Sequence, residues 1–324
     1  MCLSEVHKDL KDREVTTTSL TTSRGAGRAG DKVFSAATLA AGCLILAVLF
    51  GVAIFLVIQA FPALVASPDK IQGGEGFFAY IWPIVIGTLI AAVIALVIAT
   101  PVAIGVALFI SHFAPRKLAS GLGYVIDLLA AIPSVVYGAW GAAFLAKEIS
   151  PAYNWLANNL GWLPIFQGPA SATGKTILTA GIVLSVMVLP IITSLSREIF
   201  LQTPKLHEEA ALALGATRWE MIRMAVLPFG RPGIISAVML GLGRALGETM
   251  AVALVLSSGV LTASLIQSGN QTIAAEIALN FPEASGLKVN TLIAAGLVLF
   301  VITLGVNMIA RWIISRHKEF SGAN

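Results

Sequence analysis

Charged residues are scarce in this sequence: they make up 12% of its 324 residues, whereas hydrophobic residues make up 57%. Soluble domains usually contain about 25% charged residues. A large buried core would not halve the charged fraction, whereas helices surrounded by lipid would. The formal net charge of +4 is too small to argue for a nucleic-acid partner. The composition therefore indicates an integral membrane protein that is in contact with lipid.

Residues that build disulfides, metal sites and catalytic centres are also rare. The two cysteines lie far apart, with Cys2 in a polar segment and Cys43 in an apolar run. The four histidines are scattered without the spacing of metal ligands. The apolar runs contain no cluster of Ser, His and Cys and no paired carboxylates, so a membrane enzyme is disfavoured. We expect no metal, no cofactor and no catalysis in this chain.

Six apolar runs predict an all-α polytopic membrane protein with about six transmembrane helices. Each run is close to or longer than the ~20 residues that cross ~30 Å of hydrocarbon as a helix. Residues 1–32 are polar and rich in threonine, which predicts a disordered cytoplasmic N-terminal tail. Residues 33–316 then form the transmembrane domain and 317–324 a cytoplasmic C-terminal tail. The runs are approximately Phe34–Ile58, Ile81–Ile110, Leu118–Leu145, Thr176–Leu195, Gly233–Ser257 and Leu292–Ile314.

Basic residues are distributed unevenly between the connections. Of the 21 lysines and arginines, 16 lie in the two tails and in the connections after the second and fourth runs. Four lie in the other three connections, and the last is Arg244 within the fifth run. Cytoplasmic connections carry the excess of basic residues. The asymmetry predicts that both termini are cytoplasmic.

The longest cytoplasmic connection, about 203–228, is expected to form two short helices. Thr203 is placed to cap a first helix, which Gly215 would stop because glycine readily adopts a left-handed conformation. Thr217 can start a second helix, and Pro228 is expected to close the segment. Without further information, this is either an ordinary helical hairpin or a docking surface.

Two charged residues, Arg244 and Glu248, lie in the otherwise apolar fifth run. A charge at the centre of a bilayer costs about 2.5–3.5 kcal/mol on insertion scales. Their i, i+4 spacing would place both on one helix face, where they can pair. One interpretation is a structural ion pair. The other is a substrate gate, in which the guanidinium binds an oxyanion and Glu248 holds Arg244 when the path is empty.

The third run contains two further candidates for a transport pathway. Pro133 and Ser134 interrupt the backbone hydrogen bonding at mid-span, and the freed carbonyls must face protein or a watery cavity. Asp127 is a second carboxylate within a span. It either makes a helix contact or contributes to the pathway.

The 203–228 connection resembles the EAA loop of ABC importer permeases. The resemblance implies a coupling helix that inserts into a cleft on an ATPase subunit. Ala225 stands where that family usually has isoleucine, which leaves the docking role intact. The residues that match the motif are Glu209, Ala210, Ala211, Gly215, Leu227 and Pro228.

The chain after residue 32 is similar to one subfamily, the phosphate-specific ABC importer permeases of the PstC type with a MetI-like fold. The likeness lies in residues 131–138, 214–219 and 243–251, and in the six-helix layout. It implies a permease that imports inorganic phosphate through a bacterial plasma or inner membrane. It also implies that Arg244 and Glu248 are needed for transport. A permease for sulfate, molybdate or another small oxyanion is the alternative.

The same resemblance implies the partners of the chain. These are a second homologous permease forming a heterodimer, two ATP-binding ATPase subunits and an extracytoplasmic phosphate-binding protein. Since this chain has no ATP site, ATP and magnesium would bind to the ATPase partner. A structural or signalling subunit without a pathway is a further alternative, against which Arg244 and Glu248 argue.

Overall fold

The computed structural model describes residues 27–71, 73–257, 259 and 262–316, and within these ranges the secondary structure is helical. The chain divides after Ile54 into two units, and the sites discussed below all belong to the second. The predicted tails fall largely outside the described residues. The first helix already starts at Gly27, earlier than the predicted boundary at residue 32.

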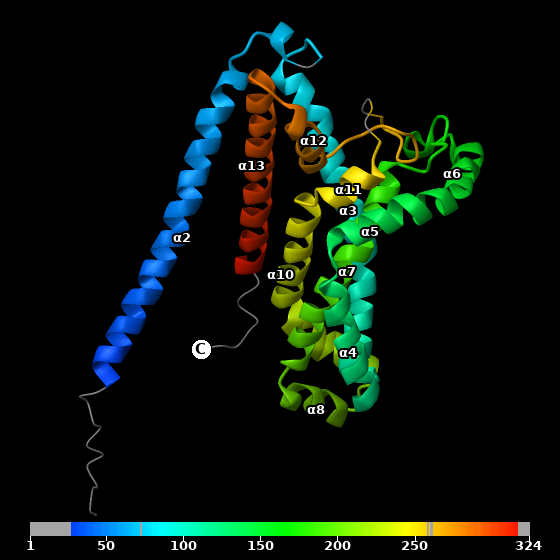
Figure 1. The fold of residues 1–324 in the computed structure, drawn as a ribbon. Helices are drawn as coiled ribbons and strands as arrows, with labels where there is room; N and C mark the ends of the chain where they lie inside the picture. Colours follow the sequence, from blue (N-terminus) through cyan, green and yellow to red (C-terminus); the bar gives the residue numbers. More distant parts are fainter. Residues whose placement is uncertain (1–26, 72, 258, 260–261, 317–324) are drawn as a thin grey trace, which may run out of the picture. The chain divides into compact units, whose positions relative to one another are not determined.

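Figure 1 shows the helices, coloured from blue to red in the order of the sequence. Among the described residues, five helical segments are long and apolar enough to cross a membrane, and a bent pair, counted as one span, makes a sixth. The bounds are α2 (Gly27–Leu64), α3 (Phe77–Leu108), α4 (Arg116–Ala130), α5 (Ser134–Trp140), α6 (Ala146–Leu160), α7 (Ile177–Leu201), α8 (Lys205–Ala213), α9 (Arg218–Met221), α10 (Leu227–Leu246), α11 (Met250–Val255), α12 (Ile273–Asn280) and α13 (Leu287–Arg316). Three π-helical turns extend them: η2 (Phe109–Phe113) after α3, η3 (Gly141–Leu145) between α5 and α6, and η5 (Ile222–Val226) between α9 and α10.

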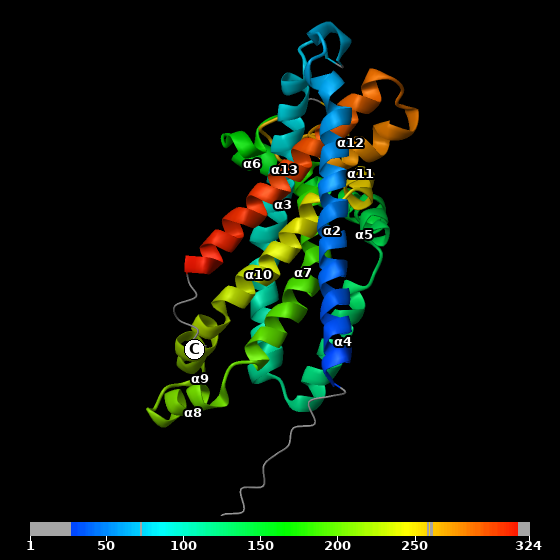
Figure 2. The ribbon, with the colours of Figure 1, turned by 90° about the vertical axis from the view of Figure 1, so that its left-hand side faces the viewer.

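Helix α7 lies at the centre of the second unit and packs against α3 and α10 (Figures 1 and 2). Small residues make this packing close. Four alanines of α3, spaced four residues apart, are fully buried, and they are Ala95, Ala99, Ala103 and Ala107. A methyl group on Gly241 of α10 would come 2.9 Å from Ile192 of α7. Such small-residue contacts bring membrane helices together by van der Waals packing.

The end of α3 opposite residues 203–228, which we call the coupling segment, is joined to α12 by polar contacts. The Tyr80 hydroxyl donates to Glu276 at 2.9 Å, and Thr88 accepts from the backbone N–H of Ile273 at 3.0 Å. Gly87 packs directly on the backbone of Gln271, where a side chain would clash. These contacts anchor α12 to the transmembrane helices.

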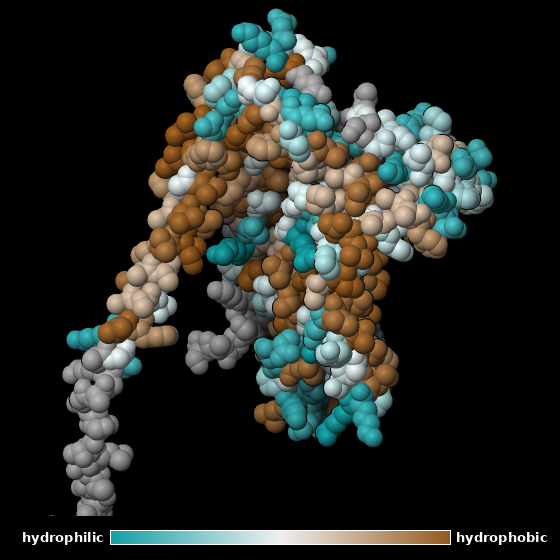
Figure 3. Space-filling model, viewed as in Figure 1, coloured by the Kyte–Doolittle hydropathy of each residue, from teal (hydrophilic) through white to brown (hydrophobic). Residues whose placement is uncertain are grey.

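Polar residues gather at the two ends of this unit. In Figure 3 the middle of the α3, α4 and α7 region is mostly brown, while teal residues cover the coupling segment around α8 and the region around α6. This distribution is what a bilayer requires of a spanning protein, because its hydrocarbon excludes polar groups.

Two of the six predicted spans are broken. The third run is divided into α4 and α5, which continues into α6, and the two parts meet at 87°. The fifth run ends as α10 at Leu246 and resumes as the short helix α11. The prediction of a continuous fifth helix from Gly233 to Ser257 is therefore wrong, because Gly247 forms a turn there.

Candidate functional site

The break between α4 and α5 is stabilised locally. Pro133 has no backbone N–H and precedes α5, so the hydrogen-bond ladder stops before it. The Tyr137 hydroxyl donates to the carbonyl oxygen of Leu129 at 2.9 Å, which supplies a partner for one carbonyl at the end of α4. The predicted interruption at Pro133 and Ser134 is confirmed, and it amounts to a sharp bend in the span.

The break between α10 and α11 places Glu248 in a capping role. Glu248 is buried, and its Oε1 accepts from the backbone N–H of Ala251 at 3.1 Å. The expected ion pair with Arg244 is not formed in this structure: no guanidinium nitrogen of Arg244 lies within 4.0 Å of a carboxylate oxygen of Glu248. The physical reason is that the helix ends before Glu248, so the i, i+4 relationship no longer holds.

The two breaks are adjacent in space. Gly138 of α5 lies against the backbone of Ala251 in α11, and a methyl group there would come 2.5 Å from its Cα atom. Ala251 is also the residue whose N–H is bound by Glu248. One glycine contact therefore connects the bend after Pro133 with the capped start of α11.

Arg244 lies in the last turn of α10, next to this meeting point. Its side chain is partly buried, and its Nε has no hydrogen-bond partner among the described residues. Gly243 beside it faces open space. The region thus combines a partly buried guanidinium group with interrupted backbone.

Asp127 is not part of this meeting point. It lies on α4 before the bend and lines a separate cavity that also contains Arg197 of α7. The structure brings Arg244, Glu248, Pro133 and Ser134 into one region, through the α5–α11 contact. Asp127 is on the side of the break that faces the coupling segment.

The coupling segment, residues 203–228, has the predicted turn but different boundaries. Gly215 has φ +86°, and Thr217 forms a capping box with Glu220, as expected for a stop followed by a new helix. Thr203 does not cap α8, since Pro204 holds that position and the Thr203 hydroxyl is buried without a partner. Pro228 does not close the segment, because α9, η5 and α10 follow one another without a break.

The turn between α8 and α9 creates a groove of about 710 Å³. Exposed apolar side chains surround this end of the chain, with Leu206 at 74% and Leu214 at 90% exposure. Exposed apolar clusters of this kind mark protein–protein interfaces. Four of the motif residues line the groove, and they are Ala210, Ala211, Gly215 and Pro228; Ala225 lines it as well. Glu209 is exposed beside it, and Leu227 is partly buried.

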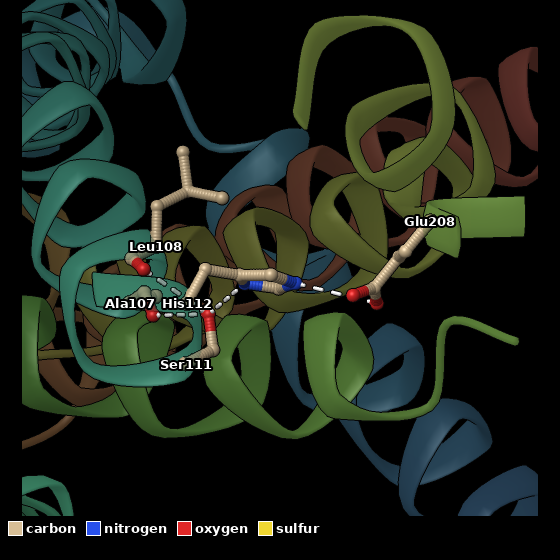
Figure 4. Close-up of polar contacts among 5 residues, drawn as sticks. All are labelled: Ala107, Leu108, Ser111, His112 and Glu208. Atoms are coloured by element: carbon tan, nitrogen blue, oxygen red, sulfur yellow. Dashed lines mark hydrogen bonds and ion pairs between the residues drawn. The ribbon is translucent and has the colours of Figure 1, made fainter. Parts of the chain in front are cut away.

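Helix α8 is also tied to the end of α3. The Nε2 atom of His112 lies 3.5 Å from the Oε1 atom of Glu208, and the Nδ1 atom of the same ring is 2.7 Å from the Ser111 hydroxyl (Figure 4). The Ser111 hydroxyl in turn donates to the carbonyl oxygen of Ala107. Helix α8 is therefore connected to the end of α3 through side chains from η2.

Sequence reasoning did not identify the roles of Tyr137, Gly138 or His112. Tyr137 and Gly138 lie in the 131–138 stretch, but their partners Leu129 and Ala251 become visible only in the fold. His112 and Glu208 are far apart in the sequence, and neither belongs to a pattern that predicts their contact.

Comparison with known proteins places the chain in a transport family. Residues 99–319 match the family model described as "Binding-protein-dependent transport system inner membrane component". The chain is 47% identical to "Phosphate transport system permease protein PstC 2" of Mycobacterium tuberculosis, over 88% of this chain and 91% of that protein. It is 39% identical to "Phosphate transport system permease protein PstC" of Mesorhizobium japonicum, over 90% and 92%.

Solved structures support the same fold at low sequence identity. A bacterial alginate ABC transporter in complex with an alginate-bound periplasmic protein aligns with a TM-score of 0.59 and 16% identity, covering 91% of this chain and 96% of that chain. An inward-facing MetNI methionine ABC transporter aligns with a TM-score of 0.51 and 18% identity, over 75% and 96%. The chain is a membrane-embedded transport subunit rather than an enzyme, and it belongs to the binding-protein-dependent transport system inner membrane components, among the PstC-type phosphate transport permeases.

Proposed function

We propose that this chain is the permease subunit that carries inorganic phosphate into the cell, along a path that passes the two adjoining helix breaks. The observation that carries the proposal is Arg244, whose Nε has no partner among the described residues and which lies beside a meeting point of interrupted helices. Irregular backbone within a membrane persists where it is buried in protein or lines a cavity. Discontinuous helices form substrate sites in other transporters.

Arg244 supplies the positive charge and the hydrogen-bond donors that an anionic substrate requires. Phosphate carries one to two negative charges at neutral pH and does not enter hydrocarbon unaided. The guanidinium presents a planar set of donors that matches two oxygens of an oxyanion. Glu248 supports this region by holding the start of α11, and its buried carboxylate limits how tightly an anion binds there. Pro133 and Ser134 contribute the bend, while Asp127 lies further along the same path.

The family membership implies an ATPase and a substrate-binding protein as partners. We infer that the finer composition is a heterodimer with a second homologous permease, two ATPase subunits that bind ATP and magnesium, and an extracytoplasmic phosphate-binding protein. The groove between α8 and α9 has the size and the apolar rim for docking an ATPase. The His112–Glu208 contact would pass movements of the docked helix to α3.

The proposed cargo is tested by uptake of radiolabelled phosphate into membrane vesicles that contain the permease with its partner subunits and ATP. Excess unlabelled phosphate should abolish the uptake, whereas equal sulfate or molybdate should leave it unchanged. A complex that accumulates sulfate or molybdate in preference to phosphate would support the other-oxyanion alternative instead.

We also propose that both termini and the coupling segment face the cytoplasm, as the basic residues predict. In a cysteine-free background, Asn158→Cys in α6 should react with an impermeant thiol reagent in right-side-out vesicles, and Lys117→Cys at the start of α4 should not. Both positions are exposed in the structure. In inverted vesicles the pattern should be reversed. Labelling of Lys117→Cys from the outside would contradict the orientation.

A further inference from the structure

A second cavity lies away from Arg244, at the same end of the permease as the coupling segment. Its volume is about 650 Å³, and it is bounded by α4, the end of α7, the end of α3 with η2, and the first residue of α8. All of these elements belong to the second unit. The sequence motifs do not point to this cavity, because its walls come from two stretches far apart in the chain, 110–127 and 197–205.

Cationic side chains outnumber carboxylates in the lining of this cavity by three to one. Arg116 comes from the first turn of α4, Arg197 from the last part of α7 and Lys205 from the start of α8. Asp127 is the one carboxylate among the described residues of the lining. Since Arg116, Ser120 and Asp127 are separated by four and seven residues, they lie on one face of α4. The cavity therefore runs along α4 from its first turn toward the bend before Pro133.

The side chain of Arg197 extends from α7 to α4 beside this cavity. Its guanidinium packs on Gly123 of α4, where any side chain would collide with it. Its Nε is buried and has no acceptor among the described residues, and it forms no ion pair with Asp127 within 4.0 Å. A buried guanidinium N–H without an acceptor is destabilising. Arg197 thus brings to the cavity a positive charge that no carboxylate of the described residues pairs with within 4.0 Å.

We propose that this cavity is a binding site for a phosphate-type anion at the coupling end of the permease. The two guanidinium groups and the ammonium group suit a phosphate group, which accepts several charge-assisted hydrogen bonds. Asp127 reduces the net attraction, so that the anion can leave. That this end faces the cytoplasm rests on the proposed function, whereas anion binding itself does not.

Two kinds of ligand carry a phosphate group that fits this cavity. One is free inorganic phosphate that has passed the helix breaks and is about to enter the cytoplasm. The other is the headgroup phosphate of an anionic lipid, because Tyr124 and Leu201 at the rim are 72% and 56% exposed. Both ligands present phosphate oxygens to the same three cations, and the experiment below separates them.

The test uses the full chain in its complex with the partner subunits, reconstituted in nanodiscs that leave both faces accessible. Cys2 and Cys43 are replaced by serine, and Ser120→Cys places one thiol in the cavity. The rate of its reaction with uncharged N-ethylmaleimide is measured. In phosphatidylcholine alone, phosphate at about twice its dissociation constant should slow the reaction roughly threefold, since only the empty site reacts. Chloride at equal ionic strength should not.

A second set of nanodiscs contains phosphatidylglycerol and no free phosphate, and protection there identifies the lipid as the source. Arg197→Gln and Arg116→Gln should each remove the protection. Lys117→Gln, the adjacent exposed cation outside the cavity, should retain it. If Arg197→Gln does not assemble, Arg116→Gln still carries the comparison.

The proposal is overturned if neither phosphate nor phosphatidylglycerol protects the thiol more than chloride does. It is also overturned if Lys117→Gln removes protection as effectively as Arg116→Gln. The result is independent of transport, because labelling needs no ATP. Protection that persists in a complex without phosphate uptake would leave this site standing while the proposed function fails.

Discussion

Arg244→Gln should leave the assembled complex intact and reduce phosphate uptake at least tenfold. The structure shows no ion pair to Glu248 that this change would break, so no buried carboxylate loses its partner. What is lost is a charged donor for the oxyanion. Hydrogen bonds to charged groups contribute about 1.5–3 kcal/mol each, which corresponds to roughly tenfold or more in rate. The measurement is phosphate uptake normalised to the amount of purified complex.

Two further variants sharpen this result. Arg244→Lys should remain poor, because an ammonium lacks the planar fork that pairs with two oxygens. Arg231→Gln removes an exposed arginine from the same helix and should transport normally. An Arg244→Gln complex that assembles and transports at the normal rate would rule out contact between this guanidinium and the anion. Loss of the protein from the membrane would instead favour a structural role.

Gly215→Val should yield a permease that reaches the membrane but does not retain or stimulate its ATPase. The residue has φ +86°, a conformation in which a β-branched side chain is strained by about 1–3 kcal/mol. There is open space around the position, so the effect comes from the backbone rather than from a clash. Relieving the strain would change the angle between α8 and α9 and with it the shape of the groove. Copurification of the ATPase and phosphate-stimulated ATP hydrolysis measure the effect.

Gly215→Asn is the matched control, because asparagine tolerates positive φ better than other residues with a side chain. It should retain most of the coupling despite adding a larger group than a methyl. If Gly215→Val binds its ATPase and transports phosphate as well as the unaltered chain does, the assignment of this segment as the docking site is wrong. If valine and asparagine are equally damaging, the cause is contact with the partner rather than backbone conformation.

Local features of the fold were predictable where neighbouring residues determine them. The spans follow from long apolar runs, and the stop at Gly215 follows from the conformational freedom of glycine. The bend at Pro133 follows from its missing N–H. Predictions that extended a local rule too far were wrong. Pro228 was expected to close the 203–228 segment, yet the helical backbone continues through it, from the π-helical turn Ile222–Val226 into α10.

The amino-acid sequence is sufficient to predict a helical membrane protein. In hydrocarbon the backbone hydrogen bonds must be satisfied within the protein, and six apolar runs are long enough to form helices that do so. The motif in residues 203–228 can also be recognised in the sequence, since its residues lie within one short connection. The relative positions of Arg244 and Glu248 become clear only in the tertiary structure, because a turn at Gly247 ends the helix between them. The tertiary structure also shows contacts between residues that are far apart in the sequence. It alone brought Gly138 to Ala251, His112 to Glu208, and Arg116, Arg197 and Lys205 around one cavity. Such contacts depend on how helices pack, and helix packing is set by surfaces assembled from distant parts of the chain.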